Sequence, residues 1–162
     1  MPDTPLLNIN NLSVDFAIHN SIVHAVKNLS FQVHAGETLG IVGESGSGKS
    51  VTSLCIMGLL PTPPGKITNG SIHYFGNPEK PIDLLQLKRK EIQAIRGKEI
   101  SMIFQEPMSA LNPVYTCGHQ VSEILQQHLH HTKKEAKENV LELFNEVKLP
   151  RIHELFNSYP HQ

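Results

Sequence analysis

The opening third of the chain alternates apolar and polar positions in the way expected of β-strands. Leu29, Phe31 and Val33 alternate with polar neighbours, which is the two-residue period of a half-buried strand. Apolar positions between Leu6 and Val26 follow the same period more loosely, on either side of a polar break. The pattern therefore predicts an antiparallel β-region over residues 1–35.

The next segment has the pattern of an α/β core. Thr38 to Val42 is a short apolar run, suited to a strand that is buried on both faces of a parallel sheet. Lys49 to Leu60 carries apolar positions at helical spacing and is followed by prolines that end a helix. We expect further strands at 70–75 and 100–104, with a helical stretch at 84–95 between them. The core predicted from this pattern covers residues 36–117.

From residue 118 onward the pattern is helical. Val121, Ile124 and Leu125 share one helix face, and Thr132 with Glu135 has the spacing of a capping box. The helix that this box begins has its apolar side at Ala136, Val140, Leu143, Phe144 and Val147. Residues 118–162 are thus predicted to be a helical region, and an incomplete one for the reason given below.

Composition narrows the class of protein. A chain of 162 residues has room for one ordinary domain or part of one. The net charge of −1 offers no bulk attraction to nucleic acid, so nucleic acid is not expected as a partner. Cys55 and Cys117 have no metal-ligand spacing and are expected to be reduced thiols. Without a basic segment followed by an apolar run near Met1, we expect a soluble protein that is not exported.

The segment from Gly43 to Ser50 matches the pattern GxxxxGK[ST] in full. A chance match in a chain of this length is on the order of one per cent. The segment follows an apolar run and opens a predicted helix, which is the context that a phosphate-binding loop requires. In such a loop successive backbone N–H groups surround the phosphates, and the positive end of the helix adds to the field. The motif predicts a phosphate-binding loop, and by itself it does not say which NTPase this is.

Each position of the loop has a physical role. The glycines allow backbone angles and close approaches that a Cβ would obstruct. Lys49 is expected to reach the β- and γ-phosphates, a catalytic role, and the Ser50 hydroxyl to be one ligand of Mg²⁺. The nucleotide-binding residues predicted on this basis are Gly43, Glu44, Ser45, Gly46, Ser47, Gly48, Lys49, Ser50 and Val51. The alternative, a flexible glycine-serine turn, is disfavoured by the full match and its context.

Three separated blocks, in order, extend the match beyond the loop. They are residues 42–52, residues 100–113 (ISMIFQEPMSALNP) and residues 158–162 (SYPHQ). Together they closely resemble the ATP-binding subunits of ABC importers for oligopeptides and dipeptides. The resemblance runs from about Leu6 to the last residue. It implies a P-loop NTPase (RecA-like) α/β core with an N-terminal antiparallel β subdomain and the start of an α-helical subdomain. It also disfavours other P-loop proteins, such as kinases or DNA-repair ATPases.

The resemblance assigns roles to two further residues. Gln105 matches the glutamine that contacts Mg²⁺ and the attacking water, and that begins the loop facing the transmembrane partner. Taken alone, a residue such as Gln105 is more often an ordinary polar residue at a strand end, and the match of the flanking residues reverses that interpretation. Phe16 matches the aromatic residue that stacks on adenine, although many relatives have tyrosine there. The alternative for Phe16 is an ordinary core aromatic.

The family also implies partners and a location. Its ATP-binding subunits dimerise head to tail, dock on transmembrane permease subunits at the inner face of the cell membrane, and act indirectly with a solute-binding protein. ATP binding and hydrolysis then drive import. Peptides are the expected solute, with nickel, glutathione or some sugars left open, because solute choice resides in the other subunits.

The chain ends at Gln162, where the family continues into its LSGGQ-like signature. The signature, the downstream aspartate-glutamate pair and the switch histidine are not in this sequence. We therefore expect a truncated cassette that is not catalytically active by itself. The alternative function is a non-catalytic nucleotide-binding fragment with no transport role. His128 and His131 are interpreted as part of a solvated helix end rather than a metal site, because no further ligand has a recognisable spacing.

Overall fold

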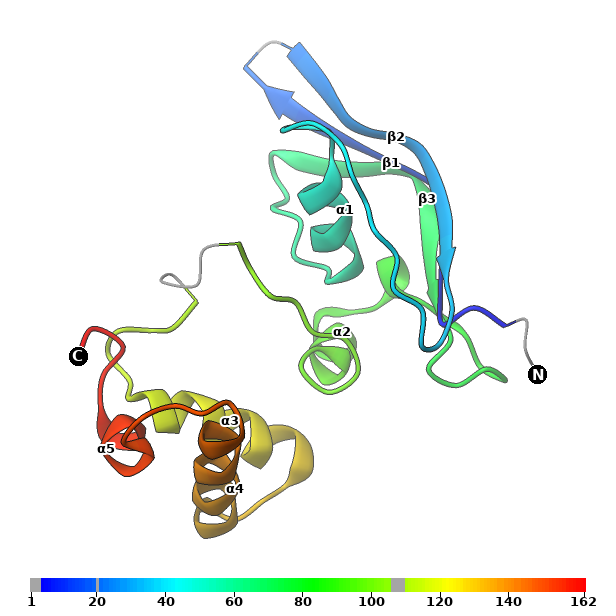
Figure 1. The fold of residues 1–162 in the computed structure, drawn as a ribbon. Coiled ribbons are helices and arrows are strands. Elements are labelled where there is room, and N and C mark those ends of the chain that lie inside the picture. The colour runs from blue at the N-terminus through cyan, green and yellow to red at the C-terminus, as the bar shows by residue number, and fades with distance from the viewer. Residues whose placement is uncertain (1–3, 20, 106–109) are drawn as a thin grey trace. The chain divides into compact units, whose positions relative to one another are not determined.

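The computed structural model describes residues 4–19, 21–105 and 110–162. The chain divides into two compact units, Met1–Met102 and Ile103–Gln162 (Figure 1). The first unit is a sheet with short helices, and the second unit is helical. No helix among the described residues combines the length and the apolar character needed to cross a membrane.

The first unit is built on a four-stranded antiparallel sheet. The strands are β1 (Leu7–Ile18), β2 (Ser21–Val33), β3 (Gly65–Tyr74) and β4 (Ile82–Asp83), and their order in the sheet is β2-β1-β3-β4. β1 and β2 form a hairpin in which Val14 lies opposite Val26 and Phe16 opposite Val23. The predicted antiparallel β subdomain is confirmed, and β1 and β2 are its two long strands.

The apolar face of this sheet forms the core of the first unit. Ile9, Leu12, Val14 and Ile72 are fully buried on it, and Cys55 of α1 (Lys49–Ile56) packs into the same cluster. Figure 1 shows α1 lying beside the sheet formed by β1, β2 and β3. The sheet thereby supports the helix on which the loop residues 43–48 depend.

The helix α1 ends earlier than the proline signal predicts. It stops at Ile56, and Gly58 adopts a left-handed conformation with φ of 60°. The Gly58 N–H donates to the Cys55 carbonyl and the Leu59 N–H to the Leu54 carbonyl, which is the pattern of a glycine C-cap. After β4 come a 3-10 turn, η1 (Leu84–Gln86), and α2 (Arg89–Ile95), so the stretch predicted at 84–95 is helical in two pieces.

Two strands predicted from apolar runs are not formed. Residues 38–42 and 101–104 are irregular, and Ile100 makes only an isolated bridge with Arg96. Among the described residues no strand pairs with 38–42, and Val42 is 92% exposed. A central strand of a parallel sheet is held by neighbours on both edges. An apolar run identifies a segment able to form such a strand, but it does not supply those neighbours.

The second unit contains α3 (Cys117–Leu129), α4 (Lys133–Glu146) and α5 (Ile152–Asn157). The predicted capping box is confirmed. The Glu135 N–H donates to the Thr132 hydroxyl at 3.3 Å, and the Thr132 N–H donates to the Glu135 carboxylate at 2.7 Å. The Thr132 hydroxyl also donates to this carboxylate and thereby lowers the pKa of Glu135. The sequence therefore fixes where α4 begins.

The buried side of α4 is narrower than predicted. Ala136, Val140 and Phe144 are buried at a spacing of four residues, whereas Leu143 and Val147 are exposed. On α3 the residues that are buried are the small Gly118 and Ser122. A Cβ at Gly118 would overlap the Phe156 ring of α5, so these helices meet through small residues and leave larger apolar ones outside.

The apolar side chains buried on the sheet are expected to stabilise the first unit. Replacing Ile72, which is fully buried, by alanine is expected to lower the free energy of unfolding by about 2–5 kcal/mol, through lost burial and a cavity. Ile22→Ala is the matched control, because Ile22 is 63% exposed and its loss should change stability by no more than about 0.5 kcal/mol. Urea unfolding followed by circular dichroism measures both. Equal effects of the two variants would contradict this assignment of the core.

Candidate functional site: a glycine loop at a helix N-terminus

The candidate site lies where the chain enters α1. Gly48 is the N-cap residue of this helix, with φ of 87°, and no side chain caps the N-terminus. The first N–H groups of a helix have no partner within the helix. No acidic residue lies in the first turn of α1. The amides and the positive end of the helix dipole are therefore available to an anion.

Gly48 sets how closely the loop approaches the sheet. A Cβ at this position would overlap the carbonyl oxygen of Ala25 on β2 and would lie 3.0 Å from Cγ2 of Val26. Only glycine adopts this backbone angle without strain and also fits this space. The start of α1 is thus positioned directly by the backbone of β2.

Other side chains support the loop from within. A Cβ at Gly43 would lie 2.6 Å from the Ser47 hydroxyl oxygen, so the two ends of the loop fold closely on each other. The Thr52 side chain is buried, and its hydroxyl donates to the Gly48 carbonyl at 3.0 Å. Our sequence analysis did not single out Thr52. The signal was its position four residues after Gly48, where a threonine hydroxyl reaches the carbonyl of the preceding turn.

Lys49 extends back over the loop. Its ammonium donates to the carbonyl oxygens of Gly43 and Glu44, both at 2.7 Å, and lies 3.3 Å from the Ser47 hydroxyl oxygen. These three oxygens occupy positions that phosphate oxygens could take around the same ammonium. Ser50, the predicted Mg²⁺ ligand, is exposed in the first turn of α1. Backbone N–H donors, the Lys49 ammonium and the exposed Ser50 hydroxyl therefore lie at the same end of α1.

Phe16 lies on β1, in the same sheet as β2, the strand that Gly48 approaches. It is opposite Val23 on β2 and Gly65 on β3, and a Cβ at Gly65 would lie 3.1 Å from the Phe16 ring. Phe16 is half-buried and packs against the core of the first unit. This packing accounts for the aromatic residue by itself, and its stacking on adenine stays a prediction.

Gln105 belongs to the second unit, Ile103–Gln162, and is exposed. Its role at Mg²⁺ and at the attacking water stays a prediction. Residues 106–109, which continue the predicted loop after Gln105, lie outside the described residues. In the second unit, Nδ1 of His131 lies 3.0 Å from the Asn139 amide nitrogen. Among the residues that the structure describes, no three His, Cys, Asp or Glu side chains form a metal-binding group.

Comparison with known proteins agrees with this geometry. The family model described as ABC transporter matches residues 26–161. The dipeptide transport ATP-binding protein DppD of Bacillus subtilis (strain 168) is 47% identical over 157 residues. This match covers 97% of the present chain and 45% of that relative. The oligopeptide transport ATP-binding protein OppD of the same strain is 44% identical, with 98% and 43% covered.

A solved structure has the same fold. The dimeric structure of a post-hydrolysis state of the ATP-binding cassette MJ0796, bound to ADP and Pi, matches with a TM-score of 0.77 and 27% identity. The match covers 96% of the present chain and 62% of that structure's chain. The chain also spans less than half the length of the two Bacillus relatives.

A glycine loop that opens a helix beside a sheet defines a nucleotide-binding protein of the P-loop class. Within that class, the match of the family model over most of the sequence is decisive: the chain belongs to the ABC transporter family. It has the mixed α/β fold of an ATP-binding cassette, with an antiparallel β subdomain. The fold class predicted from the sequence is confirmed.

The close approach at Gly48 leads to a prediction. Gly48→Ala should distort the start of α1, because the added Cβ meets the Ala25 carbonyl and the backbone angle is strained. We expect ATP affinity to fall at least about tenfold. Gly40→Ala is the matched control, since nothing lies within 4 Å of its Cβ position, and it should bind ATP normally. Calorimetric titration with Mg-ATP compares them. Normal binding by Gly48→Ala would show that the contact with β2 does not shape the loop.

Proposed function

We propose that this chain binds Mg-ATP at residues 43–51 and is the nucleotide-binding part of a longer ATPase that drives import through an ABC transporter. The observation that supports this most directly is the uncapped N-terminus of α1 under a glycine loop, with the Lys49 ammonium 2.7 Å from two loop carbonyls. An anion with several oxygens satisfies both the amides and the ammonium at once.

Different groups at the site have different roles in binding Mg-ATP. Backbone N–H groups of the loop and of the first turn of α1 donate to phosphate oxygens. Lys49 exchanges the Gly43 and Glu44 carbonyls for β- and γ-phosphate oxygens. The Ser50 hydroxyl is a ligand of Mg²⁺, which would neutralise phosphate charge when bound. Phe16 presents its open side to the adenine.

Hydrolysis requires residues beyond the phosphate loop. Gln105 orients the attacking water and contributes to Mg²⁺ coordination in the complete protein. Because the relatives are more than twice as long as this chain, hydrolysis is assigned to the longer protein. There, water positioning and donors from a second, head-to-tail ATP-binding subunit stabilise the transition state.

The solute is proposed to be a peptide. Relatives at 44–47% identity are named as oligopeptide and dipeptide transport proteins, and a glutathione import ATP-binding protein of Pectobacterium atrosepticum is 38% identical. The partners are permease subunits at the inner face of the cell membrane. A solute-binding protein acts through those subunits. ATP-driven closure of the paired ATP-binding subunits moves the permease.

One observation favours a second candidate, a nucleotide-binding fragment without a transport role. Residues 38–42, which lead into the loop, are irregular and exposed, so the loop is held firmly only from its α1 side. Measuring ATP hydrolysis by the 162-residue chain and by the longer protein separates the two candidates. Activity of the longer protein alone supports the importer ATPase, and inactivity of both, with ATP still bound, supports the fragment.

The role of Lys49 can be tested directly. Lys49→Ala removes the cation over the loop, and we expect Mg-ATP affinity to fall about tenfold or more, as for loss of a charge-assisted hydrogen bond. Lys98→Ala, which removes an exposed lysine of the same unit, is the control and should bind normally. Calorimetry with Mg-ATP measures both affinities, and circular dichroism checks folding. Unchanged affinity in folded Lys49→Ala protein would refute the assignment of the site.

A further inference from the structure

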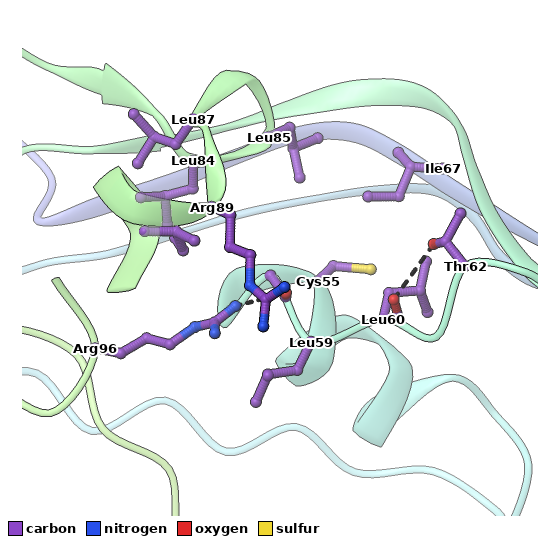
Figure 2. A pocket seen from close by; sticks show the side chains of 12 residues that line it. Cys55, Leu59, Leu60, Thr62, Ile67, Leu84, Leu85, Leu87, Arg89 and Arg96 are labelled. Atoms are coloured by element: carbon purple, nitrogen blue, oxygen red, sulfur yellow. Dashed lines mark hydrogen bonds between the residues drawn. The ribbon is translucent and has the colours of Figure 1, made fainter. Parts of the chain in front are cut away.

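A second hollow of the first unit lies away from the phosphate loop. It is a cavity of about 470 Å³ between the C-terminal end of α1, the start of β3, η1 and α2 (Figure 2). This volume lies within the range of about 300–1,000 Å³ in which proteins hold small molecules. Most of its wall is apolar, with Leu59, Leu60, Ile67 and Leu85 among the lining residues. The cavity therefore suits an apolar body.

The charges on the wall all have one sign. Arg89 and Arg96 line the cavity, and no aspartate or glutamate among the described residues does. The acidic residues nearest in sequence are engaged elsewhere. The Asp83 carboxylate accepts the N–H groups of Ile72 and Leu85, and Glu91 accepts the Lys88 N–H. The cavity thus has an excess of positive charge that the protein itself does not neutralise at the wall.

The thiol on the wall does not change this balance. Cys55 lines the cavity, and burial raises the pKa of its thiol to about 11. The thiol is therefore neutral at neutral pH, and it adds polarisable surface without adding negative charge.

The two arginines differ in what they do for the fold. Arg96 donates through Nε to the Met57 carbonyl and through Nη2 to the Gly58 carbonyl, both at 2.6 Å. It thereby caps the C-terminal end of α1, where carbonyls lack helical partners. A guanidinium has five N–H donors, so Arg96, which also lines the cavity, has donors that these two bonds do not use.

Arg89 has no comparable structural task. The Arg89 side chain has no hydrogen bond or ion pair with the other described residues. Figure 2 shows this side chain extending from α2 into the cavity, toward Cys55 and Leu59. The fold accounts for Arg96 and leaves Arg89 as a cation at an apolar wall. A planar guanidinium in such a position matches the geometry of a carboxylate.

We infer that this cavity binds an amphipathic monocarboxylate of the medium-chain fatty acid class. Its carboxylate pairs with Arg89 and the remaining donors of Arg96, and its hydrocarbon tail lies along Leu59, Leu60 and Ile67. Both groups of contacts are needed, because exposed ion pairs alone contribute little, and burial of the hydrocarbon tail supplies the rest of the affinity.

The site is separate from the phosphate loop. The loop lies at the N-terminal end of α1 and the cavity at its C-terminal end, eight residues along the helix. At a rise of about 1.5 Å per residue the two ends are roughly 12 Å apart. An anion bound at one site leaves the other accessible, so Mg-ATP and the carboxylate are expected to bind together.

Calorimetric titration of the 162-residue chain with octanoate at pH 7 tests the inference. We expect one molecule bound per chain, with an affinity unchanged by saturating Mg-ATP. Arg89→Gln should weaken octanoate binding about tenfold or more. Lys90→Gln is the matched control, because Lys90 is the next exposed cation of α2 and does not line the cavity, and its affinity should stay unchanged.

Two further ligands separate the contributions of head and tail. Octan-1-ol has the tail without the charge, and acetate has the charge without the tail, so both should bind at least about tenfold more weakly than octanoate. Octanoate binding that is absent, equal in folded Arg89→Gln protein, matched by octan-1-ol, or displaced by Mg-ATP would each overturn the inference. Displacement by Mg-ATP would locate the probe at the phosphate loop instead.

Discussion

The close contact between the backbone of Gly48 and that of Ala25 on β2 is the constraint on which the site depends. It fixes the first turn of α1 against the hairpin, so the unpaired amides of that turn are held in one place. The hairpin in turn is held by a fully buried core of Ile9, Leu12 and Val14. Preorganised N–H donors bind an anion without a further cost of ordering. The apolar face of an antiparallel sheet therefore determines where the proposed phosphate site lies.

The hydrogen bonds of Lys49 within the loop surround its ammonium with oxygen acceptors. An ammonium has only hydrogen-bond donors, so it cannot bond to the N–H groups of the loop. The Lys49 ammonium donates instead to carbonyl oxygens of its own loop. These bonds keep the lysine close to where phosphate oxygens are expected. In the proposed function, binding of a phosphate requires an exchange of oxygen partners around this one nitrogen.

Local patterns gave the parts of the fold that depend on neighbouring residues in the sequence. The alternation from Leu29 to Val33 predicted a strand that is part of β2, and the Thr132–Glu135 spacing predicted the start of α4. The glycines and Lys49 predicted a loop at the start of α1. Each of these depends on contacts within a few residues or on a single hairpin partner. The binding roles assigned to the loop residues 43–51 follow from backbone geometry at one helix end, and they stay predictions.

Features that depend on distant partners were not predictable in this way. The runs at 38–42 and 100–104 have the composition of buried parallel strands, yet such strands are stabilised only by long-range pairing. The contact between Gly48 and Ala25 joins residues that are 23 positions apart. The hydrogen bonds from Arg96 to the Gly58 and Met57 carbonyls join residues that are 38 and 39 positions apart. No local period encodes these contacts. These contacts form only when folding of the sheet brings the distant segments together.

The helix α1 is held differently at its two ends, and this governs how it can respond to ligands. Glycine packing fixes the N-terminal end, and the bonds from Arg96 to the Met57 and Gly58 carbonyls fix the C-terminal end. Between them, Thr52 and Cys55 are buried against the sheet. A helix of eight residues that is anchored at both ends and buried between them has little freedom to shift or bend, because these contacts and its internal hydrogen bonds resist both movements. A ligand at the C-terminal end of α1 can therefore bind without displacing the amides at Lys49 and Ser50, since the N-terminus of α1 cannot shift without working against the contact between Gly48 and β2.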